Sequence, residues 1–214
     1  SPPGWELDWE VLEAAFSERT KMVLLNNPMN PTGKAFTRDE LTRLAELIIR
    51  HDAYAVCDEV YEHLMFDGRE HIPMMTLPGM RERSLRIGSA GKTFSMTGWK
   101  VGYTTGDASI LSVVAKAHQF LVFTTPPNLQ RAVAHGLDHE ERWYTALGPG
   151  LQAKRDLMDG GLKDVGFDVM PCQSTYFMNA DFRPLGFDGT DVEFCEHSTR
   201  EAGVTAVPLS ALYA

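Results

Sequence analysis

The sequence has few cysteines and no long apolar run, and both absences limit what the protein can be. Its 3 cysteines lie far apart with no CxxC pair, so neither a disulfide framework nor a thiolate metal cluster is indicated. No apolar run approaches the roughly 20 residues that a membrane helix needs, and no charged and apolar leader opens the chain. We therefore expect neither a membrane span nor a signal peptide, and we expect a reducing cytoplasm.

A basic segment is also lacking. The chain carries 20 Lys and Arg against 29 Asp and Glu, and no basic run is long enough to follow a phosphate backbone. Nucleic acid is therefore not expected as a partner. We expect no pair among the 7 histidines at the i, i+4 spacing of a helical zinc site. A lone histidine is more often a surface or capping residue than a ligand, and we expect no metal. With 214 residues and 43% hydrophobic composition, the chain can bury one sizeable core, with or without a smaller satellite domain.

The first part of the sequence alternates between strand and helix patterns. The apolar run at 22–27 predicts a buried strand, and 54–57 predicts another. Between them, Thr37 and Glu40 form a capping box that opens an amphipathic helix. Strand, helix and strand in this order predict a crossover unit, and thus a parallel α/β sheet. Further strands are predicted over 84–88 and 101–105, and further helices over 110–122 and 128–139.

The pattern changes near residue 148. Gly148-Pro149-Gly150 interrupts a helical pattern, and because proline removes a backbone donor we expect a kink or a late helix start there. The sequence thus predicts part of a large domain over 1–147 and part of a smaller α+β domain over 148–214. In the second part we expect helices over 151–162, ending at a glycine-rich stop, and over 191–202, and strands over 167–170, 176–180 and 204–207.

Polar residues that directly follow the predicted strands are the candidates for chemistry, because ligands of open parallel sheets bind beyond the carboxyl ends of the strands. Lys92 follows a strand and stands among the small residues Ser89 and Gly91, which let a backbone approach a ligand closely. It is placed like a Schiff-base lysine, which must lose its proton before it attacks a carbonyl. An ordinary surface lysine or a phosphate cradle would give the same local pattern, although no GxxxxGK[ST] precedes Lys92.

Three further residues have both a structural and a functional interpretation. Asp58 either caps a loop or pairs with a protonated ring nitrogen, the partner that pyridoxal phosphate needs. Asn30 suits a turn and Tyr61 a half-buried aromatic position, yet each offers a donor for a phenolate oxygen. The residues alone leave both interpretations open.

Three motifs in order carry a resemblance to a known family. They are NNPMNPTGK at 26–34, VCDEVYEHLMFDG at 56–68 and IGSAGKTFSMTGWKVGY at 87–103. Together they make the chain resemble the class I and II aminotransferases of fold type I, especially the kynurenine, glutamine and methionine aminotransferase branch. This resemblance implies an α/β fold with a mostly parallel central sheet and helices on both faces, and a homodimer. It also implies pyridoxal 5'-phosphate as cofactor, and a neutral, aromatic or sulfur-containing amino acid and a 2-oxo acid as substrates.

The resemblance also implies roles for single residues around the cofactor ring. Lys92 would bind the cofactor covalently and then carry a proton between substrate and cofactor. Asp58 would pair with the pyridine nitrogen. Asn30 and Tyr61 would bond the phenolate oxygen, and Asn30 would also reach the substrate carboxylate.

Other roles concern the phosphate group and the substrate pocket. Ser89 and Lys100 would hold the phosphate, and Lys100 replaces the arginine of many relatives, so a point charge stands in for a bidentate fork. Phe123 would reach across a dimer interface to line the substrate pocket, although ordinary helix-end packing explains it equally well.

The resemblance has gaps, and it leaves other functions open. The family's glycine-rich phosphate loop, its ring-stacking aromatic residue and its carboxylate-binding C-terminal arginine have no counterpart in the sequence. We therefore expect residues 1–214 alone not to transaminate. A pyridoxal-phosphate C–S β-lyase would share the same site residues. A non-enzymatic, aminotransferase-like effector domain of a transcription regulator would share the fold.

Overall fold

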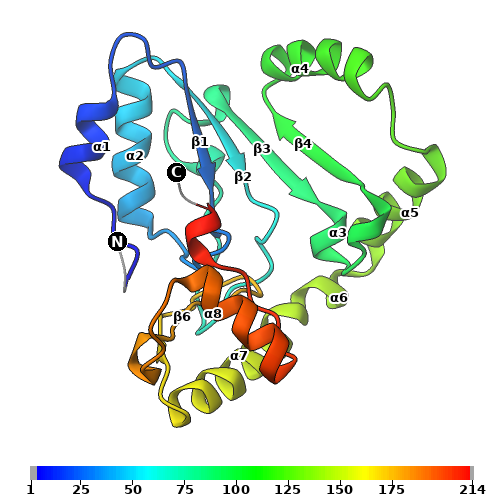
Figure 1. Ribbon diagram of the computed structural model, residues 1–214. Helices are drawn as coiled ribbons and strands as arrows, with labels where there is room; N and C mark the ends of the chain where they lie inside the picture. Colours follow the sequence, from blue (N-terminus) through cyan, green and yellow to red (C-terminus); the bar gives the residue numbers. More distant parts are fainter. Residues whose placement is uncertain (1–3, 213–214) are drawn as a thin grey trace.

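A four-stranded sheet forms the centre of the computed structural model, which describes residues 4–212 (Figure 1). Its strands lie in the order β1-β2-β3-β4, and β1, β2 and β3 run parallel, which confirms the mostly parallel sheet. β4 runs antiparallel to β3. The connection between these two strands contains only short helical turns, and without a long crossover helix the chain simply reverses direction. The strands are β1 (Met22–Asn26), β2 (Tyr54–Asp58), β3 (Ser84–Ser89) and β4 (Gly102–Gly106).

Helices pack against one face of the sheet and continue beyond its edges. The α-helices are α1 (Trp9–Ala15), α2 (Arg38–Arg50), α3 (Ala90–Thr93), α4 (Ala108–Leu121), α5 (Pro127–His139), α6 (Glu141–Thr145), α7 (Leu147–Asp164) and α8 (Asp191–His197). A π-helical turn at Ser198–Ala202 continues α8. Short 3-10 turns are η1 (Met74–Thr76), η2 (Arg81–Arg83), η3 (Thr97–Trp99), η4 (Arg183–Leu185) and η6 (Leu209–Leu212). None of the helices in residues 4–212 is long and apolar enough to cross a membrane.

The main core lies between α2 and one face of the sheet. α2 begins with the predicted capping box, in which the Thr37 hydroxyl accepts from the Glu40 amide and the Glu40 carboxylate accepts from the Thr37 amide. Leu41 and Ile48 of α2 are fully buried in the same cluster as Leu25 of β1. Burial of each such side chain contributes about 1.5–3 kcal/mol.

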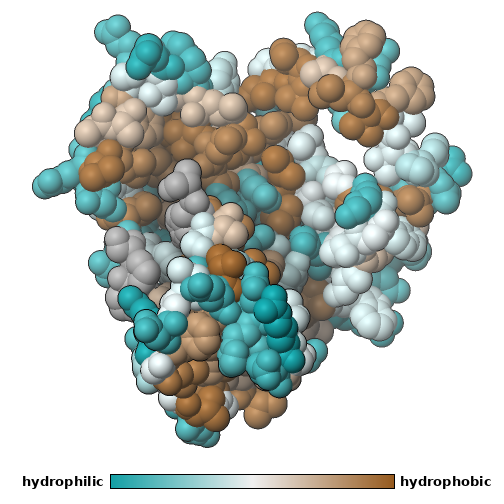
Figure 2. All heavy atoms as spheres, viewed as in Figure 1, coloured by the Kyte–Doolittle hydropathy of each residue, from teal (hydrophilic) through white to brown (hydrophobic). Residues whose placement is uncertain are grey.

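The opposite face of the same strands is open in this chain. Leu24 on β1 is 74% exposed and Tyr54 on β2 is 52% exposed. Figure 2 shows apolar side chains gathered over this region of the sheet. Alternation along β1 therefore places Leu25 in the core and leaves Leu24 uncovered within residues 4–212.

A second, smaller core fixes the segment between β3 and β4. Ala90 of α3 and Val101 lie buried against Val133 of α5, with Phe94 partly buried beside them. α5 therefore supports the loop that carries Lys92.

The break near residue 148 is observed, but it lies earlier than the sequence suggests. α6 ends at Thr145 and α7 begins at Leu147, so Pro149 lies in the first turn of α7, where a missing backbone donor costs little. The helix expected over 151–162 lies within α7, which begins four residues earlier and ends two residues later, at Asp164, so the glycine-rich stretch does not end it.

The strands expected in the second part are shorter than predicted, or absent. The segments 167–170 and 176–180 contribute only β5 (Asp168–Val169) and β6 (Ala180–Asp181), which pair antiparallel. The expected strand over 204–207 is wrong, because this segment is irregular and no strand in residues 4–212 pairs with it. An apolar run alone does not supply the neighbouring strand that a ladder requires.

Candidate active site

The carboxyl ends of the three parallel strands meet at one edge of the sheet. Asn26 of β1 aligns with Asp58 of β2, and Asp58 aligns with Ile87 of β3. Asn30 lies in the loop after β1, where its amide N–H donates to the Asn26 side chain over 2.6 Å. This register brings two of the predicted site residues, Asn30 and Asp58, to the same edge.

The antiparallel strand brings two more candidates to this edge. Ser89 at the end of β3 pairs with Gly102 at the start of β4, so Lys100, two residues earlier, also lies at the carboxyl edge. Lys92 lies between them on the single turn of α3. The reversal at β4 is thus what brings Lys100 back toward Ser89.

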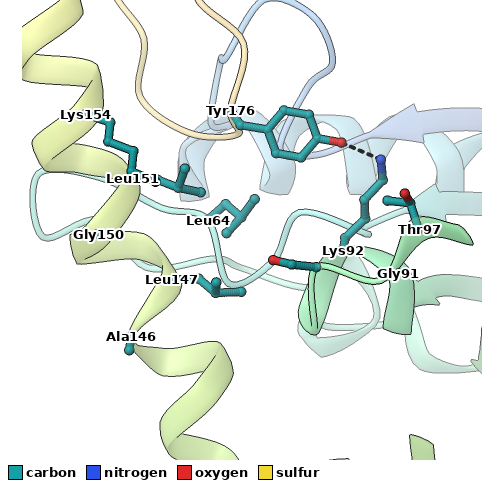
Figure 3. Close-up of a pocket in the computed structure, with 11 residues that line it drawn as sticks. Leu64, Gly91, Lys92, Thr97, Ala146, Leu147, Gly150, Leu151, Lys154 and Tyr176 are labelled. Atoms are coloured by element: carbon teal, nitrogen blue, oxygen red, sulfur yellow. Dashed lines mark hydrogen bonds between the residues drawn. The ribbon is translucent and has the colours of Figure 1, made fainter.

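A chain of side-chain hydrogen bonds connects four residues at the centre of the site. The Lys92 Nζ donates to the Tyr176 hydroxyl over 2.5 Å (Figure 3). The Tyr61 hydroxyl also donates to the Tyr176 hydroxyl, over 3.3 Å, and the Asn30 Nδ2 donates to the Tyr61 hydroxyl over a long 3.5 Å. Three of the four were predicted as site residues, and the structure brings them together.

The two tyrosines of this hydrogen-bonded group, Tyr61 and Tyr176, ionise differently. Tyr61 is only 2% exposed, and burial raises the pKa of its hydroxyl, with the Tyr176 hydrogen bond and the Asp58 charge acting in the same direction. Burial also opposes ionisation of Tyr176, but the hydrogen bonds from Lys92 and Tyr61 and the Lys92 charge outweigh it and lower the pKa. Tyr61 therefore stays a donor, and Tyr176 is the acceptor of the pair.

Asp58 lies at the end of β2, half-buried, one turn before Tyr61. One carboxylate oxygen of Asp58 accepts from the Val60 amide over a long 3.4 Å. Its backbone carbonyl accepts from the Asn27 amide and from the Asn26 side chain, which ties the strand end to the loop after β1. The position of the Asp58 carboxylate is therefore set mainly by the backbone.

Tyr176 was not predicted as a site residue. Sequence reasoning placed it only at the start of an expected strand, and its bond to Lys92 joins residues 84 positions apart. Every tyrosine has an apolar body with a polar tip, so this property does not distinguish a site tyrosine from the others. No signal in the sequence singled it out.

A cavity of about 420 Å³ opens beside the Lys92 amine. Lys92 and Tyr176 line one side of it, and the start of α7 lines the other (Figure 3). Its walls are largely apolar, with Leu64 and Leu151 among them, and Lys154 adds a second cation. The amine is therefore accessible to a small molecule.

The remaining candidates are more exposed and less connected. Lys100 is exposed with a left-handed backbone, φ 55°, and no side-chain hydrogen bond within residues 4–212 joins it to Ser89. Phe123 follows α4, has φ 70° and is 74% exposed. Neither a hydrogen bond nor a ring contact in the described part of the chain joins the Phe123 side chain to the other candidates. The structure thus does not bring Phe123 into the site of this chain.

A possible histidine pair was overlooked in the sequence. His135 and His139 lie one turn apart on α5, with ring centroids 4.5 Å apart. Within residues 4–212, however, no group of three or more His, Cys, Asp or Glu residues gathers in a way that could hold a metal ion. The pair carries no metal assignment.

Comparison with known proteins agrees with this geometry. The family model "Aminotransferase class I and II" matches residues 1–214. The solved structure of N-succinyldiaminopimelate aminotransferase from Mycobacterium tuberculosis superposes with a TM-score of 0.96 at 40% sequence identity, covering 100% of this chain and 56% of that chain.

Two curated proteins show the same partial coverage. The kynurenine–oxoglutarate transaminase of Dictyostelium discoideum is 39% identical over 232 residues, which cover 100% of this chain and 53% of that protein. The methionine aminotransferase of Escherichia coli is 38% identical over 213 residues, covering 100% and 55%. The chain therefore spans about half the length of the relatives it matches.

Proposed function

The chain belongs to the class I and II aminotransferases, and from this we propose that the protein moves an amino group from an L-amino acid to a 2-oxo acid with pyridoxal 5'-phosphate as cofactor. One observation carries the proposal. The Lys92 amine faces an open cavity and forms part of a hydrogen-bonded group with Tyr61 and Asn30, at the strand edge where Asp58 ends β2.

The side chains at this edge fit the ring of the proposed cofactor. An aldehyde requires a primary amine, which Lys92 supplies. A protonated ring nitrogen requires an acidic partner, and Asp58 is the carboxylate at the end of β2. A phenolate oxygen requires donors. The Asn30 amide provides one, and the Tyr61 hydroxyl provides a second once its hydrogen turns from Tyr176 to the cofactor. Each functional group of the ring thus has a chemically matched partner.

The phosphate group has two proposed partners at the same edge. Ser89 offers a hydroxyl donor, and Lys100 offers a positive charge two residues before the position that pairs with Ser89. Phosphate is bound well by such a point charge, although without the planar fork of arginine. We assign both residues to the phosphate.

The chain's own residues would then divide the work of the reaction. When bound, the cofactor supplies a carbonyl carbon for the amino group and a conjugated ring that accepts the electron pair left by the α-proton. Lys92 would hold the cofactor at rest and, once released, carry the proton. Asp58 would pair with the ring nitrogen. Tyr61, whose pKa burial raises, would remain a hydrogen-bond donor.

A neutral, aromatic or sulfur-containing amino acid is the proposed substrate class. Two of the similar proteins are named for kynurenine and for methionine, which supports this class. Both also carry aminotransferase or transaminase names, which favours transfer over β-elimination or a purely regulatory role.

We also propose a homodimer that acts in the cytoplasm. Phe120, Leu121 and Phe123 at the end of α4 are 87%, 82% and 74% exposed. An exposed apolar group of this kind suits a protein interface, and Phe123 would there line the pocket of the second subunit. Three free cysteines fit a reducing compartment. In this arrangement residues 1–147 belong to a large domain and 148–214 to a small one.

Borohydride reduction of the natural full-length protein, followed by peptide mass mapping, tests the cofactor assignment. We expect a pyridoxyl group on Lys92, and Lys92→Arg should remove both the label and at least about a hundredfold of the turnover, since proton transfer alone contributes roughly 10²–10⁴. Lys154→Arg, a matched change in the same cavity, should keep both. A pyridoxyl group on Lys154 instead would contradict the proposal.

A further inference from the structure

Tyr176 makes a contact with the Lys92 amine that none of the predicted roles explains. The Tyr176 hydroxyl is 2.5 Å from the Lys92 Nζ. The amine also lies 5.2 Å and 5.1 Å from the ring centroids of Tyr61 and Tyr176, a distance at which both ring faces attract a cation. The two rings meet edge to face at 5.3 Å, so together they enclose one side of the amine.

The backbone holds Tyr176 at this place from several directions. Thr175 is fully buried with φ 66°, a backbone conformation that is rare for a β-branched residue and persists only where the surroundings enforce it. Its amide donates to the Leu64 carbonyl over 2.9 Å. The adjacent Ser174 hydroxyl donates to the Gly33 carbonyl over 2.9 Å. Tyr176 is therefore held against both the loop after β1 and the loop after β2.

The direction of the hydrogen bonds makes Tyr176 the final acceptor. The Asn30 amide donates to Tyr61, Tyr61 donates to Tyr176, and Lys92 donates to Tyr176 from the other side. A phenol oxygen that accepts two bonds, one of them from an ammonium group, is favoured in its ionised form. The lowered pKa of Tyr176 and the raised pKa of Tyr61 agree with this direction.

We propose that Tyr176 is a further catalytic residue, the proton partner of the Lys92 amine. In the step, one Nζ–H bond of the Lys92 ammonium breaks and an Oη–H bond forms on the Tyr176 phenolate. The electron pair stays on the nitrogen, and both side chains become neutral. The amine is then free to attack a carbonyl or to take up a proton, and the reverse step restores the charged pair. This role rests on the proposed function of Lys92.

The first test needs no catalytic activity. It follows tyrosinate absorbance against pH in the cofactor-free, natural full-length protein. The difference between wild type and Tyr176→Phe isolates the Tyr176 hydroxyl. Tyr54→Phe removes an exposed phenol on β2 and is the control: the same difference spectrum taken with this variant gives the titration of a tyrosine outside the site. The groups that face Tyr176 are Lys92 and Tyr61, with Asp58 acting on Tyr61 and Lys154 lining the same cavity.

We expect the Tyr176 titration to move to higher pH when Lys92 is replaced by Met, because removing the opposite charge at hydrogen-bond distance disfavours the ionised phenol. Lys154→Met, which removes the other cation of the cavity, should leave the pH of the Tyr176 titration unchanged. A Tyr176 titration that does not move with Lys92→Met would overturn the pairing, whether or not the protein is an aminotransferase.

The second test measures turnover with an α-deuterated amino acid. If Tyr176 exchanges the proton, Tyr176→Phe should lower kcat by about 10²-fold, raise the deuterium isotope effect and leave KM nearly unchanged. A merely structural role would change KM or thermal stability instead. An unchanged kcat would overturn proton exchange. A wild-type enzyme without any transamination, but with the Lys92-dependent titration, would overturn the proposed function and leave the Tyr176 pairing standing.

Discussion

The two halves of the candidate site differ in how the chain holds them. The ring half consists of Asn30, Asp58, Tyr61 and Lys92. Asn30, Tyr61 and Lys92 are joined through Tyr176 by hydrogen bonds, Tyr61 is nearly fully buried, and Asp58 is held at the end of β2. The phosphate half, Ser89 and Lys100, lies at the same strand edge without a side-chain bond between its two members in residues 4–212.

The fold fixes the side chains of the ring half before any ligand binds, whereas the side chains of the phosphate half become fixed only when a ligand binds. A side chain fixed by its neighbours loses little freedom when a ligand binds, whereas an exposed lysine must give up its rotamers. Substitutions in the ring half should therefore affect turnover strongly. Substitutions in the phosphate half should affect mainly cofactor affinity, and only modestly.

Of the substitutions that compare the two halves, Asp58→Asn in the ring half should have the largest effect. A neutral amide no longer keeps a ring nitrogen protonated, and a hydrogen bond to a charged group contributes about 1.5–3 kcal/mol. This range corresponds to a loss of about 10- to 150-fold in kcat. Cofactor affinity should change far less, because Lys92 still binds covalently.

Steady-state kinetics with saturating cofactor check this expectation. Asp188→Asn, a matched change at an exposed acid, should leave kcat unchanged. If Asp58→Asn lowers kcat only two- or threefold, Asp58 is not the partner of the ring nitrogen.

A smaller effect is expected at Gly91, which lies between the two halves. A Cβ added there would stand 3.0 Å from the Thr97 backbone and 3.4 Å from the Ser89 hydroxyl, so the loop would have to shift. We expect Gly91→Ala to lower the free energy of unfolding by about 1–3 kcal/mol, as overpacking does, and to weaken cofactor binding through both Ser89 and Lys92.

Gly98→Ala is the matched control in the same loop, since a Cβ there meets nothing within 4 Å. Its free energy of unfolding should stay within about 0.5 kcal/mol of the wild type. Denaturant unfolding and cofactor titration measure both quantities. If Gly91→Ala and Gly98→Ala change stability and cofactor binding equally, the close packing around Gly91 does not hold Ser89 and Lys92 in place.

Much of the ring half was predictable from the sequence because its information is local. Strand ends followed by polar residues predict a ligand edge, and the observed register brings Asn30 and Asp58 to it. The Thr37 capping box likewise gave the correct start of α2. A motif within one loop, such as the one around Lys92, can be identified from neighbouring residues alone.

The features that the sequence missed depend on distant partners. Tyr176 contacts a residue 84 positions away, and its place follows from backbone bonds to the loops after β1 and β2. The direction of β4 depends on the absence of a crossover helix, which strand propensity does not register. α7 passes through Gly160 and Gly161 because eighteen residues of helix tolerate the cost of about 1 kcal/mol for each glycine.

The smallest effect is expected at Lys100, in the phosphate half. An exposed ion pair contributes about 0.2–1 kcal/mol, so Lys100→Met should raise the cofactor's Kd no more than about fivefold. Salt should reduce the difference further, because exposed charges are screened. Lys100→Arg should bind at least as tightly as wild type, since its planar fork can donate two hydrogen bonds to phosphate.

Lys116→Met, at an exposed lysine on α4, is the control and should leave Kd unchanged. Fluorescence titration of the cofactor-free, natural full-length protein gives these constants. If Lys100→Met raises the Kd a hundredfold or more, the two halves do not differ as described, because only a charge held as firmly as the side chains of the ring half could contribute that much to cofactor binding.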